Sequence, residues 1–173
     1  DGGGGNDVIE GNFGNDILSG GSGDDQINDD QGANTLDGGA GNDILTSRSL
    51  NGTHTILGGD GSDNINATGQ TIYIDGGNDI DNIYLYGYIE NEGNRTYIEE
   101  GIANVLGGSG DDYINSQYFL DVNIDAGEGN DYMSIDQNSK ANSIARLFGG
   151  EGNDYTYANY SSNIKADGGI GND

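Results

Sequence analysis

The chain has 173 residues, of which 34 are glycine and none is proline, cysteine or tryptophan. Its formal net charge of −25 excludes nucleic acid as a natural partner, because phosphate binding needs lysine and arginine, and favours cations instead. Only 32% of the residues are hydrophobic, too few for an ordinary globular core; no apolar run approaches the ~20 residues of a membrane span, and the lack of cysteine excludes disulfides and thiolate metal sites.

One nine-residue pattern recurs along the whole chain. Its cleanest copies occupy residues 20–28 and 38–46 and read G-G-x-G-x-D-x-U-x, in which U is a large apolar residue. Full or nearly full copies begin at residues 2, 20, 38, 58, 76, 107, 126, 149 and 168. Most lie 18 to 20 residues apart, which is the length of two nonapeptides and therefore of one coil with two strands. The sequence predicts an all-β fold, a right-handed parallel β-roll or β-helix solenoid with two short strands in each coil of about 18 residues.

Between these copies lies a second row of turns, which loses the pattern along the chain. Only its first member, residues 11–16, keeps most of the pattern. The position that would carry the carboxylate changes from polar to apolar, in the order Asp16, Asn34, His54, Ile72, Ala103, Val122, Ala145 and Ile164. We expect the lost turns to have become extra strand, with the former carboxylate position pointing inward. We interpret His54 as a surface or spacer residue rather than a catalyst, because a lone imidazole has no partner.

Two ladders of inward-pointing side chains follow from this alignment. The regular row contributes Ile9, Ile27, Leu45, Ile65, Ile83, Ile114, Met133 and Thr156. The second row contributes, two positions after each former carboxylate position, Leu18, Leu36, Ile56, Ile74, Val105, Ile124, Leu147 and Ala166. Strand alternation places both ladders on the inner faces of the two rows of strands, so the sequence predicts a narrow core between them.

The longest interruption of the repeat runs from residue 85 to residue 99. Apolar and tyrosine residues flank Glu92 and Gly93, a pattern that resembles a hairpin with a glycine-containing turn. We predict a surface flap, with a partner-binding tongue as the alternative. Further along, Tyr113, Tyr132 and Tyr155 share one position of successive coils and should point outward. They favour a strand-stabilising aromatic ladder, and the alternative is a stripe that binds glycans.

The repeated turn has the chemistry of a calcium site. Calcium takes 6–8 oxygen ligands from carboxylates and backbone carbonyls, and glycines allow several carbonyls to point into one cavity. The turn keeps its carboxylate where Asp79 replaces the glycine at the fourth position and where Ala126 replaces the glycine at the first. The candidate ligands are Asp7, Asp25, Asp43, Asp63, Asp81, Asp112, Asp131, Asp154 and Asp173 on the regular edge, and Asp16, together with Asn34, on the second. Nine stacked turns leave room for about eight ions along the regular edge, and we expect the site at Asp173 to be incomplete.

These residues give the chain a resemblance to the RTX family, the glycine- and aspartate-rich nonapeptide repeats of secreted bacterial proteins. The resemblance implies a parallel β-roll that binds calcium, exported through a type I secretion channel and folded by extracellular calcium. We therefore expect residues 1–173 to form a single RTX segment of a larger extracellular or cell-surface protein, open at both ends and without a catalytic site. The parent would be an adhesin, surface-layer or matrix protein that contacts other copies of the chain or surface glycans. The alternative is the C-terminal secretion and folding module of an exported toxin, protease or lipase.

Overall fold

The computed structural model describes residues 1–98, 100–136, 143–159 and 163–173. Two parallel sheets face each other along the length of the molecule. The first contains nine strands in the order β1 (Gly3–Gly4), β3 (Ile17–Ser22), β5 (Thr35–Ala40), β7 (Thr53–Asp60), β9 (Thr71–Asn78), β13 (Ile102–Ser109), β15 (Asp121–Glu128), β17 (Ile144–Glu151) and β19 (Asn163–Ile170). The second contains eight, in the order β18 (Tyr155–Asn159), β16 (Tyr132–Asp136), β14 (Tyr113–Gln117), β10 (Asn82–Tyr86), β8 (Asn64–Thr68), β6 (Ile44–Arg48), β4 (Gln26–Asp29) and β2 (Val8–Glu10).

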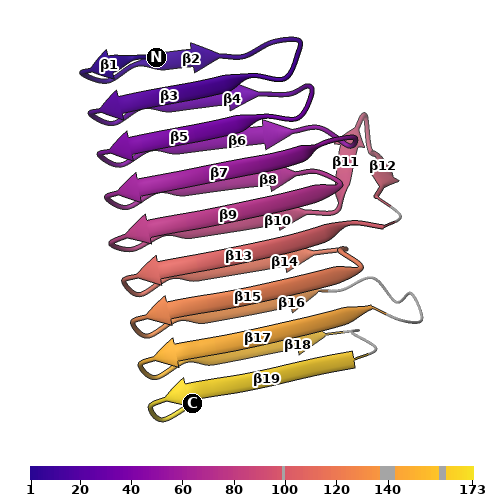
Figure 1. Ribbon diagram of the computed structural model, residues 1–173. Coiled ribbons are helices and arrows are strands. Elements are labelled where there is room, and N and C mark those ends of the chain that lie inside the picture. Colours follow the sequence, from indigo (N-terminus) through magenta and orange to yellow (C-terminus); the bar gives the residue numbers. More distant parts are fainter. Residues whose placement is uncertain (99, 137–142, 160–162) are drawn as a thin grey trace.

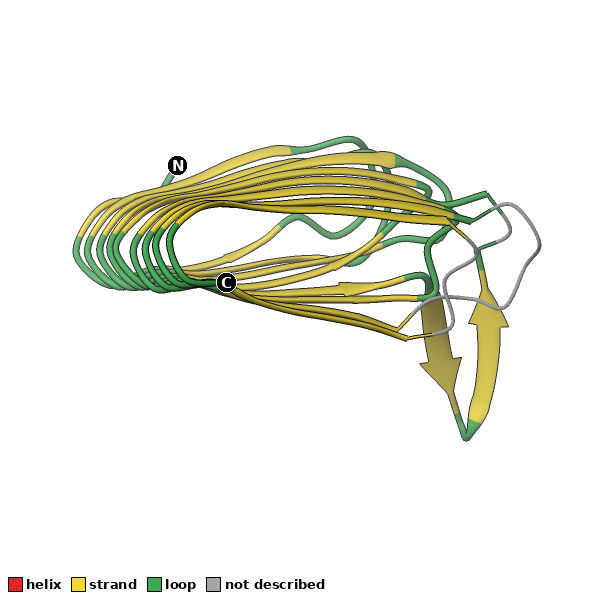
Figure 2. Cartoon of the chain, turned by 90° about the horizontal axis from the view of Figure 1, so that it is seen from below, coloured by secondary structure: helices red, strands yellow, loops and turns green. Residues whose placement is uncertain are grey.

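The chain winds as a β-solenoid of about 8 turns with about 19 residues in each (Figure 1). This arrangement confirms the fold predicted from the repeat spacing. Seen along its axis, the solenoid has one edge of closely superposed turns and one edge of unequal loops (Figure 2). We call these the regular edge and the second edge. No helix among the described residues is long and apolar enough to cross a membrane.

The strands of the nine-stranded sheet lengthen where the second row loses its turn pattern. β3 and β5, which follow Asp16 and Asn34, have 6 residues each. β7 and the later strands β9, β13, β15, β17 and β19 have 8 each. In β7 the extra residues include His54, at the former carboxylate position. Where the turn pattern is lost, the chain therefore forms additional strand, as the alternation in the sequence predicted.

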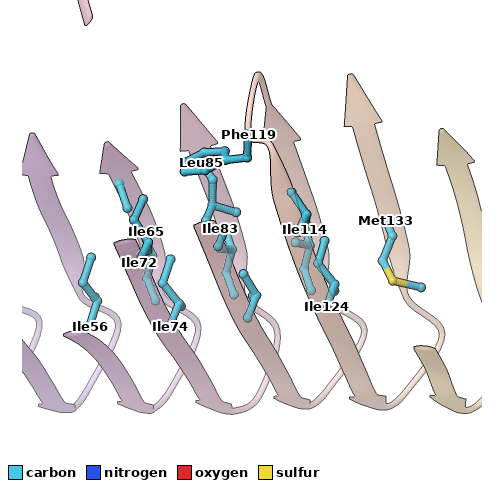
Figure 3. Close-up of a cluster of buried hydrophobic side chains, with 14 of the residues drawn as sticks. Ile56, Ile65, Ile72, Ile74, Ile83, Leu85, Ile114, Phe119, Ile124 and Met133 are labelled. Atoms are coloured by element: carbon cyan, nitrogen blue, oxygen red, sulfur yellow. The ribbon is translucent and has the colours of Figure 1, made fainter. Parts of the chain in front are cut away.

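The core lies in the narrow space between the two sheets (Figure 3). Both predicted ladders point into it, but their ends are less well covered: Ile9 and Leu18 are partly buried, and Thr156 and Ala166 are exposed. The eight-stranded sheet adds a third inward column of side chains, which the sequence pattern did not predict. This column consists of Asp29, Ser47, Ala67, Leu85, Ser116, Ile135 and Ala158, which are in register from strand to strand.

His54 is fully buried, so its interpretation as a surface or spacer residue is wrong. Because side chains alternate across a strand, the register that points Ile56 of β7 into the core also points His54 there. The His54 Nδ1 lies 2.8 Å from the Oγ of buried Ser47. Burial lowers the pKa of His54 below its usual 6.5, although a backbone hydrogen bond to Ser49 opposes this effect. The imidazole is therefore held as a neutral member of the core.

Residues of the long insertion form an antiparallel pair, β11 (Tyr88–Asn91) and β12 (Asn94–Tyr97), which projects from the second edge (Figures 1 and 2). Glu92 and Gly93 at its tip have φ values of 49° and 81°, as the tight turns of hairpins require. Arg95 pairs with Glu90 at 2.9 Å and lies 4.6 Å from the centre of the Tyr88 ring. The hairpin is thus held by contacts within itself and to neighbouring tyrosines.

The tyrosines of the eight-stranded sheet stack face to face along the axis. The ring centroids of Tyr113 and Tyr132 are 5.0 Å apart with an interplanar angle of 2°, and those of Tyr132 and Tyr155 are 5.3 Å apart at 13°. Sugar rings bind aromatic residues through the ring face, and here the faces between neighbours are covered. The geometry therefore favours the strand-stabilising ladder over the glycan-binding stripe.

Candidate metal centre

The regular edge owes its shape to glycines at the second and fourth positions of each nonapeptide. In the copy that begins at residue 20, Gly21 and Gly23 have φ values of 107° and 118°, which residues with a Cβ rarely adopt. Asp79 takes the fourth position of its own copy at φ 73°, because the short polar side chain of aspartate tolerates this region better than most. The same loop therefore recurs in successive coils.

The aspartates at the sixth position connect successive coils through one carboxylate oxygen. The backbone N–H of Asp25 donates a hydrogen bond to Oδ1 of Asp43 in the next coil, with a nitrogen–oxygen distance of 2.7 Å. The same bond, at 2.7–3.1 Å, joins Asp7 to Asp25, Asp43 to Asp63, Asp63 to Asp81, Asp81 to Asp112, Asp112 to Asp131, Asp131 to Asp154 and Asp154 to Asp173. All nine predicted ligands of the regular edge therefore form one continuous column.

In eight of these nine residues the second carboxylate oxygen is buried and has no hydrogen-bond partner in the part of the chain that the structure describes. This holds for Oδ2 of Asp7, Asp25, Asp43, Asp63, Asp81, Asp112, Asp131 and Asp154. A Cβ placed on Gly2 would lie 2.6 Å from Oδ2 of Asp7 and 2.7 Å from the carbonyl oxygen of Gly20 in the next coil. A carboxylate oxygen and a backbone carbonyl of the adjacent coil thus converge on the same space. This donor set fits calcium, which binds carboxylate and carbonyl oxygens. A carboxylate oxygen that is buried away from water also depends on a cation more strongly than a solvated one does.

In the metal-free column, the surroundings of the sixth-position aspartates disfavour the ionised form of their carboxyl groups. Burial raises the pKa of Asp81 and Asp112 to about 7 and of Asp63 and Asp131 to about 6. Hydrogen bonds from the backbone of the preceding coil lower these pKa values in part, and repulsion from neighbouring aspartates raises them again. A divalent cation between the coils would remove this repulsion and favour the ionised form.

The second edge carries the same arrangement only between its first two coils. The backbone N–H of Asp16 donates to Oδ1 of Asn34 at 3.1 Å, which is the counterpart of the bonds on the regular edge. Oδ2 of Asp16 is buried without a partner. In the coils after Asn34 the equivalent side chains are His54 and then apolar residues. Structure therefore brings Asp16 and Asn34 together, and offers no further aspartate at this position along the second edge.

No group of three or more His, Cys, Asp or Glu side chains among the described residues is close enough to hold a metal by side chains alone. A site on the regular edge would take one carboxylate from a coil and complete its coordination with backbone carbonyls. The ion pairs of the described part, Arg95 with Glu90 and Arg146 with Asp121, involve none of the predicted ligands. Within the described ranges, no cationic side chain forms an ion pair with these predicted ligands.

A second ladder on the same edge was missed in the sequence. Side-chain oxygens at the fifth position accept hydrogen bonds from the backbone of the next coil, as when Asp24 Oδ1 accepts from the N–H of Asn42 at 2.9 Å. The other acceptors of this kind are Asn6, Asn42, Asp111, Asn130 and Asn153. The frequent Asn or Asp at this position was the available signal. These hydrogen bonds add a second connection between successive coils and do not involve Oδ2 of the sixth-position aspartates.

Replacing Asp112 with asparagine should isolate the contribution of one Oδ2 atom. The amide oxygen can still accept the hydrogen bond from Asp81, which is 2.8 Å long in the native chain, whereas the charged oxygen is lost. We expect the free energy of unfolding in saturating calcium to fall by about 1.5–3 kcal/mol, the range for a hydrogen bond to a charged group. Urea unfolding followed by circular dichroism would measure it.

Asp125→Asn is the matched control for this substitution. It makes the same change in charge, but Asp125 is exposed on the outer face of β15, where substitutions usually change stability by less than about 0.5 kcal/mol. Equal destabilisation by the two variants would contradict the assignment of Asp112 as a ligand and point to a general effect of charge.

Comparison with known proteins agrees with this geometry. A family model for the RTX calcium-binding nonapeptide repeat matches residues 1–28, 19–53 and 146–159, in 4 copies. The comparison with curated proteins found no significant match, and neither did the comparison with solved structures. The matched residues include Asp7, Asp25, Asp43 and Asp154 of the regular column as well as Asp16 of the second edge. The resemblance in the sequence is confirmed for residues 1–53 and 146–159, where the chain carries RTX calcium-binding nonapeptide repeats.

Proposed function

We propose that this chain is a calcium-binding structural region of a larger extracellular protein, which folds when it meets calcium outside the cell. The observation that carries the proposal is the column of buried, unpartnered carboxylate oxygens along the regular edge. Calcium between the coils would supply the positive charge that these oxygens lack. About eight ions along this edge would each join one coil to the next, with Asp173 contributing an incomplete site.

Each part of the repeat would have its own role in that process. The sixth-position aspartates hold the cation through Oδ2 and the preceding coil through Oδ1. The glycines keep the turn narrow, and the inward ladders bury apolar surface once the coils are aligned. In the absence of calcium, the net charge of −25 opposes compaction. An extended chain is suited to passage through a type I secretion channel.

The parent is best described as a cell-surface protein of the adhesin, surface-layer or matrix type. Two features support this assignment: the hairpin that projects from the second edge, and the unequal loops around it. Both elaborate a surface beyond what repeated calcium binding needs, and other copies of the chain or surface glycans are the partners we propose for it. The region itself would have no catalytic role.

The alternative is a C-terminal module that assists the secretion and folding of an exported toxin, protease or lipase. It rests on the same repeats and differs only in what they are attached to. A metalloprotease, lipase or toxin domain encoded beside this region would favour the alternative. Tandem adhesive domains would favour the surface protein.

The test is a titration of the calcium-free chain with calcium, followed by far-ultraviolet circular dichroism and hydrodynamic radius. We expect folding with a midpoint of roughly 10⁻⁴–10⁻³ M, the affinity range of extracellular calcium modules. Magnesium is the control, because its small radius and preference for octahedral water should prevent folding at equal concentration. Folding at submicromolar calcium, or equal folding in magnesium, would contradict a switch that responds to the extracellular compartment.

A further inference from the structure

Asp29 is a buried carboxylate that the repeat pattern does not explain. It stands at the first position of the second-row turn in the second coil, where the first coil has Gly11. The residue ends strand β4 and is only 1% exposed. Its neighbours in register are Ser47 and then Ala67, so the side chain points into the interior between the sheets.

Only one of the two carboxylate oxygens of Asp29 has a partner. Oδ1 accepts a hydrogen bond from the backbone N–H of Gln31 at 3.0 Å. Oδ2 is buried and accepts none, and it lies against Gly11 of the preceding coil, where a Cβ would overlap it. An ionised oxygen that is buried without a partner is strongly destabilising, so a cation would be favoured at this position.

Asp16 brings a second unpartnered oxygen to the same region. Its Oδ2 is also buried without a hydrogen-bond partner among the described residues, and Asp16 belongs to the turn that begins at Gly11, the residue against which Oδ2 of Asp29 lies. Asn34 lies beside both: its Oδ1 accepts from the N–H of Asp16, and its amide donates to the carbonyl of Gln31 at 3.1 Å. No Lys or Arg forms an ion pair with either aspartate in the part of the chain that the structure describes.

We propose that Asp29 and Asp16 together bind one calcium ion on the second edge, between the first and second coils. The unusual element is Asp29, because the repeat pattern has glycine at its position. Asp29 therefore supplies a carboxylate in addition to that of Asp16. The sixth position of its own turn is Asn34, which carries no charge, instead of another aspartate. This inference rests on the proposed function, since it assigns a further ion to the same calcium-dependent fold.

The next coil shows why the site occurs once. Ser47 replaces Asp29 and His54 replaces Asn34, and these two neutral side chains hydrogen-bond to each other at 2.8 Å. In the following coil the same two positions hold Ala67 and Ile72, both buried. At these two positions the second edge therefore changes from a carboxylate and an amide, Asp29 and Asn34, to a neutral polar pair and then to apolar contact.

The experiment counts calcium ions bound to the full chain by native mass spectrometry at saturating calcium, with circular dichroism to confirm folding. Asp29→Asn should bind one ion fewer than the native chain. Asp30→Asn is the matched control, because the adjacent Asp30 is exposed and loses the same charge; its count should not change. Asp16→Asn should also lose one ion, and the double variant Asp16→Asn/Asp29→Asn should lose one ion in total, because both residues serve the same site.

The outcomes separate this inference from the proposed function. A native chain that binds no calcium would overturn both. A native chain that binds calcium, with an unchanged count for Asp29→Asn, would overturn the role of Asp29 alone, as would a loss of two ions in the double variant. If Asp29→Asn does not fold, Asp29→Gly restores the glycine found at residue 11 and removes the same carboxylate, so its ion count decides instead.

Discussion

Removing calcium from the folded chain is expected to unfold the whole roll and not only its regular edge. The eight unpartnered Oδ2 atoms of the regular column are spaced from the first coil to Asp154, so every interface between coils loses a cation when calcium is removed. In a solenoid each coil contacts only its neighbours. The core between the sheets is formed by these same coils, so it cannot hold the chain together once the coils separate. Repulsion within a chain of net charge −25 then favours an extended ensemble.

Two signals from different places in the molecule would show that the loss is complete. The strand signal in the far ultraviolet reports on both sheets, and the near-ultraviolet signal of stacked Tyr113, Tyr132 and Tyr155 reports on the outer face of the eight-stranded sheet. Both should disappear at the same chelator concentration and return when calcium is added back. A tyrosine signal that survived after the turns had opened would show that the eight-stranded sheet is stable without calcium.

The sequence predicted the regular edge well because its constraint is local. Each turn needs glycines at set positions and a carboxylate at the sixth, so a period can be followed without knowing the partner coil. Even the irregular Asp79 could be placed correctly. What the pattern did not reveal was how each aspartate divides its oxygens, with Oδ1 serving the preceding coil and Oδ2 left for the cation. That division depends on the stacking of coils and is not encoded in the spacing within one of them.

The second edge was harder to predict because its residues are selected by contacts between coils. The third inward column was missed since its members include Asp29, Ser47 and Ser116, which hide the alternation expected of a buried strand face. The misplacement of His54 has the same origin. Ser47 and His54 are buried as a hydrogen-bonded pair, and such a contact becomes visible only when neighbouring coils are placed side by side.

The two edges together explain how the molecule could combine calcium dependence with a varied surface. Repetition on the regular edge fixes the rise from coil to coil, and the strands transmit this spacing to the second edge. There the chain can add residues between strands, as it does between β10 and β13, where β11 and β12 form the projecting hairpin. Apolar side chains such as Ile72 and Val122 occupy the former carboxylate position in the later coils and are buried in the core.

Lowering the pH of the calcium-free chain from about 7.5 to about 5 is expected to restore much of its strand structure. In the folded metal-free chain the pKa values of Asp81 and Asp112 are raised to about 7, and those of Asp63 and Asp131 to about 6, above the ordinary 3.8. The folded chain therefore binds more protons than the unfolded chain between about pH 4 and pH 7, and its stability rises as the pH falls through this window. Protons would replace calcium in neutralising the column.

His54 acts in the opposite direction and supplies the control. Its buried imidazole has a pKa below 6.5, so the unfolded chain takes up the extra proton in acid, and the folded chain loses stability as the pH falls below that value. The carboxyls of Asp63, Asp81, Asp112 and Asp131, whose pKa values are raised to about 6 or 7, outweigh this single group. The variant His54→Leu should regain more structure at pH 5 than the native chain does. Calcium must be removed by dialysis because chelators weaken in acid, and pH 5 keeps the chain above its isoelectric point of about 4.1. Circular dichroism that stays featureless in both chains from pH 7.5 to pH 5 would show that burial of the carboxylates is not what keeps the calcium-free roll unfolded.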